Sequence, residues 1–225
     1  MSDLSPFTSL PSANHPYRRS AFQIALLMFL TAGLYLFVWA FYVRRSCAEL
    51  LERDDQPLWK SIALVVPIFN LFQMFDLGKM IEGVRWRADP ERPQTSRLPW
   101  LGVSLFFIGA LWKIPNGFWT LAALDFVPVA IMHLTFSRAQ SALVGEGARP
   151  TPFRWPEWIV IILGSAFWVL VLFGFTIPDG DRGLIPDWWA GYVVTALAIC
   201  ALVAIRVTEQ RFRSAGAPAN PKIDR

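Results

Sequence analysis

Hydrophobic residues along this chain fall into long, nearly continuous runs that are separated by short polar segments. An α-helix needs about 20 apolar residues to cross ~30 Å of hydrocarbon, and several of these runs come close to that length or exceed it. The pattern predicts an all-α polytopic membrane helix bundle with six transmembrane helices in three hairpins. The predicted helices cover about residues 21–43, 58–78, 98–114, 118–136, 158–177 and 188–205.

Polar segments flank this predicted transmembrane domain, which covers residues 21–207. Residues 1–20 are rich in Ser, Pro and Asn, and we expect a disordered cytoplasmic tail. Arg18 and Arg19 could begin a signal peptide, but the apolar run that follows is longer than the hydrophobic region of such a peptide, so we expect a retained helix. Residues 208–225 are predicted to form a second cytoplasmic tail.

One stretch, from Leu58 to Gly83, has a weaker copy between Phe118 and Leu143. The segment VPIFNLFQMF of the first is matched by VPVAIMHLTF of the second when Pro67 is aligned with Pro128. The match indicates a membrane hairpin that is used more than once. A proline inside a helix removes one backbone hydrogen bond, so we expect both prolines to bend their helices.

The composition agrees with a protein whose solvent is the bilayer. Hydrophobic residues make up 54% of the chain and charged residues 17%, the mean hydropathy is +0.39, and there are eleven tryptophans. Cys47 and Cys200 have no spacing typical of a metal site, and two histidines, of which only one lies in an apolar run, exclude a haem bound by two intramembrane histidines. We therefore expect no metal site and no cofactor.

The distribution of basic residues predicts the orientation of the bundle. The formal net charge is +4, but Lys and Arg flank the apolar runs, which is typical of membrane anchoring and not of a nucleic-acid surface. We expect a bacterial inner membrane protein with both termini in the cytoplasm, because this orientation places 15 basic residues on the cytoplasmic side and 6 on the outer side. The first connection, residues 44–57, fits least well. The six basic residues outside are Arg44, Arg45, Arg53, Lys60, Lys113 and Arg182.

The first two predicted helices carry a family resemblance. The segments TAGLYLFVWAFYVRRSCAELLE and VVPIFNLFQMFDLGKMIEG combine a Gly-Leu-Tyr motif, an aromatic and tryptophan cluster, and a Pro-x-x-Asn-Leu motif. Over about residues 22–84 the chain resembles a family of small bacterial multi-pass membrane proteins of unknown function. The resemblance implies the class of protein and no activity.

Four polar residues form a candidate intramembrane polar site. Asp125 lies about seven residues inside the fourth predicted helix, where a charge costs about 2.5–3.5 kcal/mol, so it either pairs within the bundle or carries a proton. His133 follows eight residues later, and Asn70 and Gln73 share one edge of the second helix. Hydrogen bonds between helices would account for all four, as would a polar path. Trp168 is also expected to direct its indole N–H to a partner in the bundle.

The motifs favour a protein that is not an enzyme, because no G-x-S-x-G, H-E-x-x-H or Walker loop is present and no catalytic residue is assigned. The leading hypothesis is a non-catalytic membrane interaction or scaffold module. The alternative is a small transporter or channel for protons, cations or a small solute that uses Asp125. An enzyme that acts on lipid-borne substrates would need the interfacial cluster of Asp76, Lys79 and Arg85, for which snorkelling is the better explanation.

The expected partners are the lipid bilayer and further copies or other membrane proteins, with no nucleic acid. Gly102 and Gly109 lie on one face of the third predicted helix, and small residues let another helix approach closely. Such small-residue faces would support a homo- or hetero-oligomer.

Overall fold

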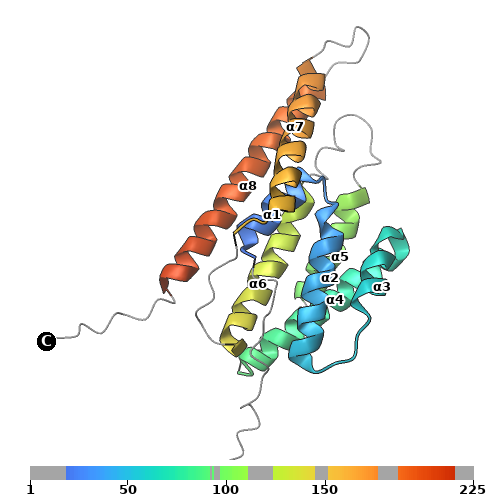
Figure 1. The fold of residues 1–225 in the computed structure, drawn as a ribbon, viewed down its shortest axis with the longest axis vertical. Helices are drawn as coiled ribbons and strands as arrows, with labels where there is room; N and C mark the ends of the chain where they lie inside the picture. The colour runs from blue at the N-terminus through green and yellow to red at the C-terminus, as the bar shows by residue number, and fades with distance from the viewer. Residues whose placement is uncertain are drawn as a thin grey trace, which may run out of the picture.

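The structure, a computed structural model, describes residues 19–91, 93, 97–110, 124–144, 152–176 and 187–215. In this part of the chain the fold is all-α, as predicted, and holds eight α-helices, a 3₁₀ helix at Ala63–Val65, 3₁₀ residues 124–125 before α6, and no strand (Figure 1). The elements are α1 (Ala21–Leu30), α2 (Tyr35–Leu51), α3 (Pro57–Ile62), η1 (Ala63–Val65), α4 (Pro67–Ala88), α5 (Arg97–Ala110), α6 (Phe126–Val144), α7 (Trp155–Thr176) and α8 (Asp187–Ala215).

The first predicted helix, residues 21–43, is in fact a helical hairpin. The chain leaves the α-helix after Leu30, and Ala32 and Gly33 take positive φ angles of 48° and 87°. Arg19, just before α1, and Trp39, in α2, both contact His133, so the two arms run back along each other. The prediction of one continuous helix here is wrong, because the left-handed backbone at Ala32 and Gly33 reverses the chain.

The second predicted helix, residues 58–78, is also broken. Val66 is extended, with φ −86° and ψ 119°, and Pro67 is the first residue of α4. Pro128 is the third residue of α6. The prediction that both prolines bend helix interiors is therefore wrong: each lies in the first turn of a helix, where the missing N–H has no intrahelical partner to lose.

The connections before and after this second hairpin lie at the same end of the bundle. Arg87 Nη2 lies 2.6 Å from Glu52 Oε1, and Arg87 Nη1 donates to the Leu50 carbonyl at 2.7 Å. In Figure 1, α2, α4 and α6 all end toward the bottom of the view. The prediction that residues 44–57 and 79–97 lie on opposite sides of a membrane is contradicted by these contacts, because residues 57–88 leave one end and return to it.

Glycines set the packing of α5 against α4. A β-carbon on Gly78 would lie 2.6 Å from the Cα of Pro99, and one on Gly102 would collide with the Met74 carbonyl. Pro99 opposite Gly78 and Gly102 opposite Met74 define an antiparallel pair. The predicted small-residue contact of Gly102 is thus made between α5 and α4 of the same chain. The surroundings of Gly109 lie outside the described residues.

α7 and α8 form a long hairpin that packs on α1 (Figure 1). Trp168 Nε1 donates to the Phe29 carbonyl at 2.8 Å, and the two rings stack 4.6 Å apart, which confirms the predicted buried partner of this tryptophan. α8 continues to Ala215 and Glu209 is buried, so residues 208–215 are not a tail. Arg19 and Ser20, predicted in the other tail, are buried as well, and residues 1–18 lie outside the described residues.

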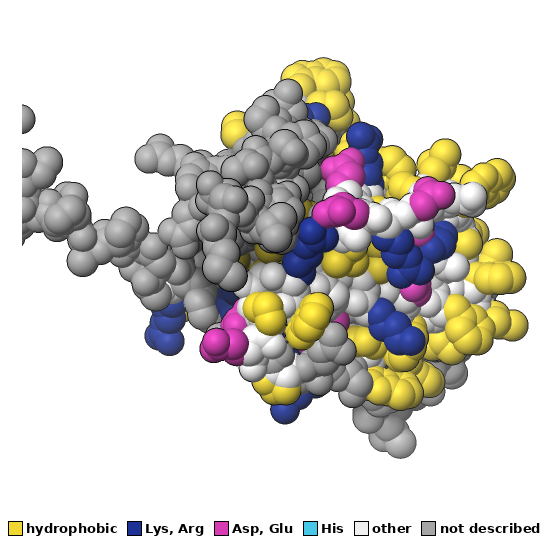
Figure 2. Space-filling view, turned by 90° about the horizontal axis from the view of Figure 1, so that it is seen from below, with side chains coloured by type: hydrophobic (Ala, Val, Ile, Leu, Met, Phe, Trp, Pro, Cys, Tyr) yellow, Lys and Arg dark blue, Asp and Glu magenta, His cyan; other side chains and the backbone are white. Residues whose placement is uncertain are grey.

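The surface separates charged from apolar side chains. Seen from below, Lys, Arg, Asp and Glu side chains gather over one end of the molecule, and hydrophobic side chains border them (Figure 2). We call this the polar end. It includes residues 45–55, which cover the last turns of α2 and the loop after it, and residues 82–91, which cover the last turns of α4 and the segment that follows. Within the described residues, no helix is both long enough and apolar enough to cross a membrane.

Candidate functional site

A buried charge network joins the two hairpins just inside the polar end. Arg44 of α2 is 2% exposed, and its Nη1 lies 2.7 Å from Asp76 Oδ2 of α4 and 3.5 Å from Asp55 Oδ2. Lys60 of α3 pairs with the other Asp55 oxygen and lies 3.6 Å from Asp76. Two cations and two carboxylates therefore balance each other between α2, α3 and α4.

Arg44 also binds the backbone of the second hairpin. Its Nη2 donates to the Gln73 carbonyl at 2.9 Å, so one guanidinium bonds a side chain and a main-chain group of α4 at once. The rigid fork of a guanidinium is suited to such a bridge. Because breaking a buried pair leaves an uncompensated charge, the network fixes the position of α4 against α2.

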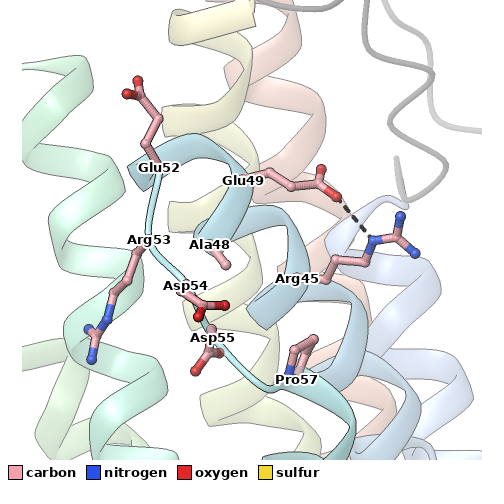
Figure 3. Close-up of a pocket in the computed structure, with 8 residues that line it drawn as sticks. All are labelled: Arg45, Ala48, Glu49, Glu52, Arg53, Asp54, Asp55 and Pro57. Carbon is pink, nitrogen blue, oxygen red and sulfur yellow. Dashed lines mark hydrogen bonds and ion pairs between the residues drawn. The ribbon is translucent and has the colours of Figure 1, made fainter.

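A shallow groove of about 370 Å³ lies beside this network (Figure 3). Arg45 and Glu49 reach toward each other on one side of it and form an ion pair at 3.0 Å, while Arg53 points away on the other side. The lining holds no Ser, Cys or His, so it offers no nucleophile with a neighbouring base. It is lined by Arg45, Ala48, Glu49, Glu52, Arg53, Asp54, Asp55 and Pro57.

Cys47, one turn from Arg44, is fully buried. Burial raises the pKa of its thiol above the ordinary range, although Arg44 acts in the opposite direction. A protonated, inaccessible sulfur is neither a nucleophile nor a metal ligand. Among the described residues no group of three or more His, Cys, Asp or Glu side chains could hold a metal ion.

His133, a predicted site residue, closes the base of the first hairpin. It is 1% exposed, its Nε2 lies 2.8 Å from the Arg19 carbonyl, and its Nδ1 accepts the Trp39 indole N–H at 3.2 Å. A carbonyl only accepts, so Nε2 carries the proton and both ring nitrogens are used. His133 is thus the packed hydrogen-bonding residue that one of the two sequence interpretations required.

Arg19 continues this contact into the α7–α8 hairpin. Its guanidinium pairs with Glu157 of α7 at 2.8 Å and donates to the Pro152 carbonyl at 2.6 Å. The Phe22 N–H donates to Glu209 of α8 at 3.4 Å. The start of α1, the start of α7 and the last part of α8 therefore meet at one level of the bundle.

Asp125 lies in a 3₁₀ segment, residues 124–125, that leads directly into α6, and the predicted start of this helix at residue 118 lies outside the described residues. Its carboxylate packs against Gly33 so closely that a β-carbon on Gly33 would collide with Oδ2. The side chain is partly buried. Asp125 thus lies at the tip of the first hairpin.

Asn70 and Gln73 lie in the first two turns of α4 and serve the second hairpin. Asn70 Nδ2 donates to the Leu64 carbonyl at 3.1 Å, across the break at Pro67. The Asn70 Oδ1 and Gln73 Oε1 atoms are buried without a hydrogen-bond partner among the described residues, and Gln73 contributes its backbone carbonyl to Arg44. The expected bonds from these amides to other helices are thus replaced by a bond within the hairpin.

His133 and Asn70 thus bond to separate partners, Asp125 packs on Gly33, and Gln73 contributes its backbone carbonyl, so the four predicted polar residues do not line one site. The interfacial cluster expected for a lipid-acting enzyme is also divided: Asp76 pairs with Arg44, Lys79 lies 4.7 Å above the Phe75 ring, and Arg85 pairs with Glu82. Sequence reasoning missed the Arg44 network. Its signal was the pair Arg44 and Arg45, which opposed the predicted orientation.

Comparison of the chain with protein-family models, with curated proteins and with solved structures gave no match.

Proposed function

We propose that this chain is an integral membrane protein that acts as a non-catalytic interaction or scaffold module. The observation that carries the proposal is the amount of exposed apolar surface. Ile162, Leu163, Val169 and Leu170 of α7 are each 65–69% exposed, and Val203 of α8 is 56% exposed. Water-exposed apolar patches of such extent are rare, whereas a lipid-facing helix requires them.

The length of the last hairpin supports this location. α7 has 22 residues and α8 has 29, which correspond to about 33 Å and 43 Å. The sequence contains no charged residue from Trp158 to Thr176. The proposal places this hairpin across the bilayer, including the part of α7 beyond Val171, whose side chains lie outside the described residues.

The distribution of charge supports an orientation with the polar end in the cytoplasm. Because the second hairpin returns to the polar end, Arg44, Arg45, Arg53 and Lys60 move to the same side as the 15 basic residues already assigned there. Lys113 and Arg182 are then the basic residues left for the other side. The revised assignment satisfies the positive-inside rule better than three crossing hairpins do.

A transporter or channel would require polar residues along a common path. Asp125 and His133 instead pack against opposite ends of the first hairpin, and Asn70 bonds within the second. The bonded arrangement favours a rigid module over a conducting path. Its partners, in this proposal, are the bilayer and other membrane proteins.

Membrane extraction and ion flux test the two parts of the proposal. The full chain should stay with membranes in alkaline carbonate and be released by detergent; recovery in the soluble fraction would contradict the membrane location. Purified protein in vesicles should not dissipate a proton or monovalent-cation gradient between pH 5 and 8. A flux that Asp125→Asn abolishes would replace the scaffold with the transporter.

A further inference from the structure

Residues 57–88, the second hairpin, are tied to the polar end at both of their ends. Lys60 near the start pairs with Asp55, and Asp76 in the middle of α4 pairs with Arg44. Arg87 near the end pairs with Glu52. Charged groups of this kind remain at the aqueous side of a membrane, so both ends of the hairpin lie on that side.

The rising arm of this hairpin is too short to cross a bilayer. α3 and η1 together have nine residues, which gives about 14–18 Å at a rise of 1.5–2.0 Å per residue. That is about half of the ~30 Å hydrocarbon thickness. The chain then reverses at Val66 and Pro67, at the depth of one leaflet.

Apolar side chains are exposed continuously around this reversal, from η1 through Val66 to the first turns of α4, and we call them the tip. Val65 and Ile68 are 67% and 69% exposed, and Val66, Phe69 and Phe72 are exposed as well. Trp59, closer to the base, is also exposed, which suits the membrane interface. The gradient from ion pairs at the base to apolar side chains at the tip is complementary to the polarity of one lipid leaflet.

The backbone at the tip is also suited to hydrocarbon, where unpaired polar groups are costly. The Val66 N–H donates to the Ala63 carbonyl at 3.1 Å, and the Asn70 N–H donates to the Val66 carbonyl at 2.8 Å. The Leu64 carbonyl, which the proline break leaves without an α-helical donor, accepts the Asn70 side chain. These backbone groups of the turn are thus paired within the chain.

We infer that residues 57–88 form a re-entrant hairpin that enters the bilayer from the polar end, contacts lipid acyl chains of one leaflet with its tip, and returns without crossing. The inference rests on the proposed membrane location and adds the lipid contact and the side of each connection. It commits to acyl chains as the occupant of the tip, because the side chains exposed there are apolar and the ion pairs lie at the base of the hairpin.

Single cysteines carrying an environment-sensitive fluorophore would test this inference. The background is the full chain with Cys47→Ala and Cys200→Ser, reconstituted at low density in vesicles of phosphatidylcholine and phosphatidylglycerol. Labels at Ile68→Cys and Leu170→Cys should lose fluorescence to phospholipids that carry a nitroxide on the acyl chain. A label at Asp54→Cys should lose little.

The sides of the hairpin are read in the same vesicles, captured through a tag at the amino terminus. Labels at Asp54→Cys and Glu91→Cys should both be destroyed by external dithionite, which does not cross the membrane. Protection of one of them would show that the hairpin crosses and would overturn the inference.

The quenching outcomes separate this inference from the proposed function. If neither Ile68 nor Leu170 responds to the nitroxide lipids, the membrane location itself fails. If Leu170 responds and Ile68 does not, the protein is in the bilayer but its second hairpin is covered by protein, for example by a second copy, and the lipid contact is wrong.

Discussion

The two helical hairpins of this chain each reverse its direction within an apolar run, but by different backbone conformations. The first, α1 and α2, reverses through left-handed residues at Ala32 and Gly33; the second, α3 to α4, reverses through an extended Val66 followed by Pro67. The arms of the first are largely buried, with Ile24 0% exposed, whereas the tip of the second is open, with Ile68 69% exposed. The turn of the first packs Gly33 against Asp125, although the neighbouring Leu34 is 69% exposed, whereas the turn of the second presents several apolar side chains at the surface.

Both turns nevertheless use one polar side chain to pair backbone groups that the helix break releases. In the first hairpin the Thr31 hydroxyl donates to the Leu27 carbonyl at 2.8 Å and accepts the Tyr35 N–H at 2.9 Å. In the second, Asn70 binds the Leu64 carbonyl. The comparison teaches that small polar residues within apolar runs mark places where the backbone stops being a regular helix.

The largest effect is expected from separating the hairpins. Arg44→Met leaves Asp55, which is buried, with one partner fewer and removes the bonds to Asp76 and to the Gln73 carbonyl of α4, so the free energy of unfolding should fall by about 3–5 kcal/mol. Thermal unfolding in detergent measures the loss. Arg45→Met is the matched control: its partner Glu49 is exposed, and the change should be about 0.5 kcal/mol or less. If both variants lost the same free energy of unfolding, the Arg44 network would not be what holds the two hairpins together.

The difference in burial predicts opposite outcomes for one substitution made in each hairpin. Ile24→Ala creates a cavity in the core and should lower the free energy of unfolding by about 2–5 kcal/mol. Ile68→Ala removes an exposed side chain and should change it in detergent by about 0.5 kcal/mol or less. Chemical or thermal unfolding of both variants gives the comparison, and a large cost at Ile68 would mean that the tip is covered.

The turn of the first hairpin depends on a backbone that only glycine adopts easily. Gly33→Ala adds strain at φ 87° and a collision with the Asp125 carboxylate, so we expect a loss of about 1–3 kcal/mol in the free energy of unfolding. Gly83→Ala is the control, because a β-carbon there meets only the Leu51 side chain at 3.5 Å and alanine favours a helix. A neutral Gly33 variant would contradict the tight turn.

The smallest effect should come from the polar side chains at the two turns. Thr31→Val and Asn70→Leu each remove a bond to a released backbone group, and each should cost about 0.6–2 kcal/mol in detergent unfolding. Thr135→Val, which removes an ordinary bond to the Ile131 carbonyl inside α6, serves as control and should be nearly neutral. If it costs as much as the other two, the turns have no special need for these residues.

The last two helices of the chain could be predicted from the sequence: both ends of α7 and the start of α8 agree closely, whereas α8 continues ten residues beyond its predicted end. The predictions 158–177 and 188–205 became α7 at Trp155–Thr176 and α8 from Asp187, because each apolar run begins beside a proline or a charged residue that ends the neighbouring loop. The role of His133 as a packed hydrogen-bonding residue was one of two stated interpretations. Trp168 found the carbonyl partner that its indole required.

The sequence by itself specified the all-α class, the apolar runs and the identity of the polar residues within them, because hydrophobic pattern and side-chain chemistry are local properties. The two reversals, the common side of the first and second connections and the network of Arg44 were decided only by the tertiary structure. A run such as residues 21–43 is compatible with a straight helix or a hairpin, since its apolar pattern suits either form. Which of them forms depends on distant partners, Asp125 against Gly33 and Asp76 against Arg44, and apolar periodicity carries no information about those contacts.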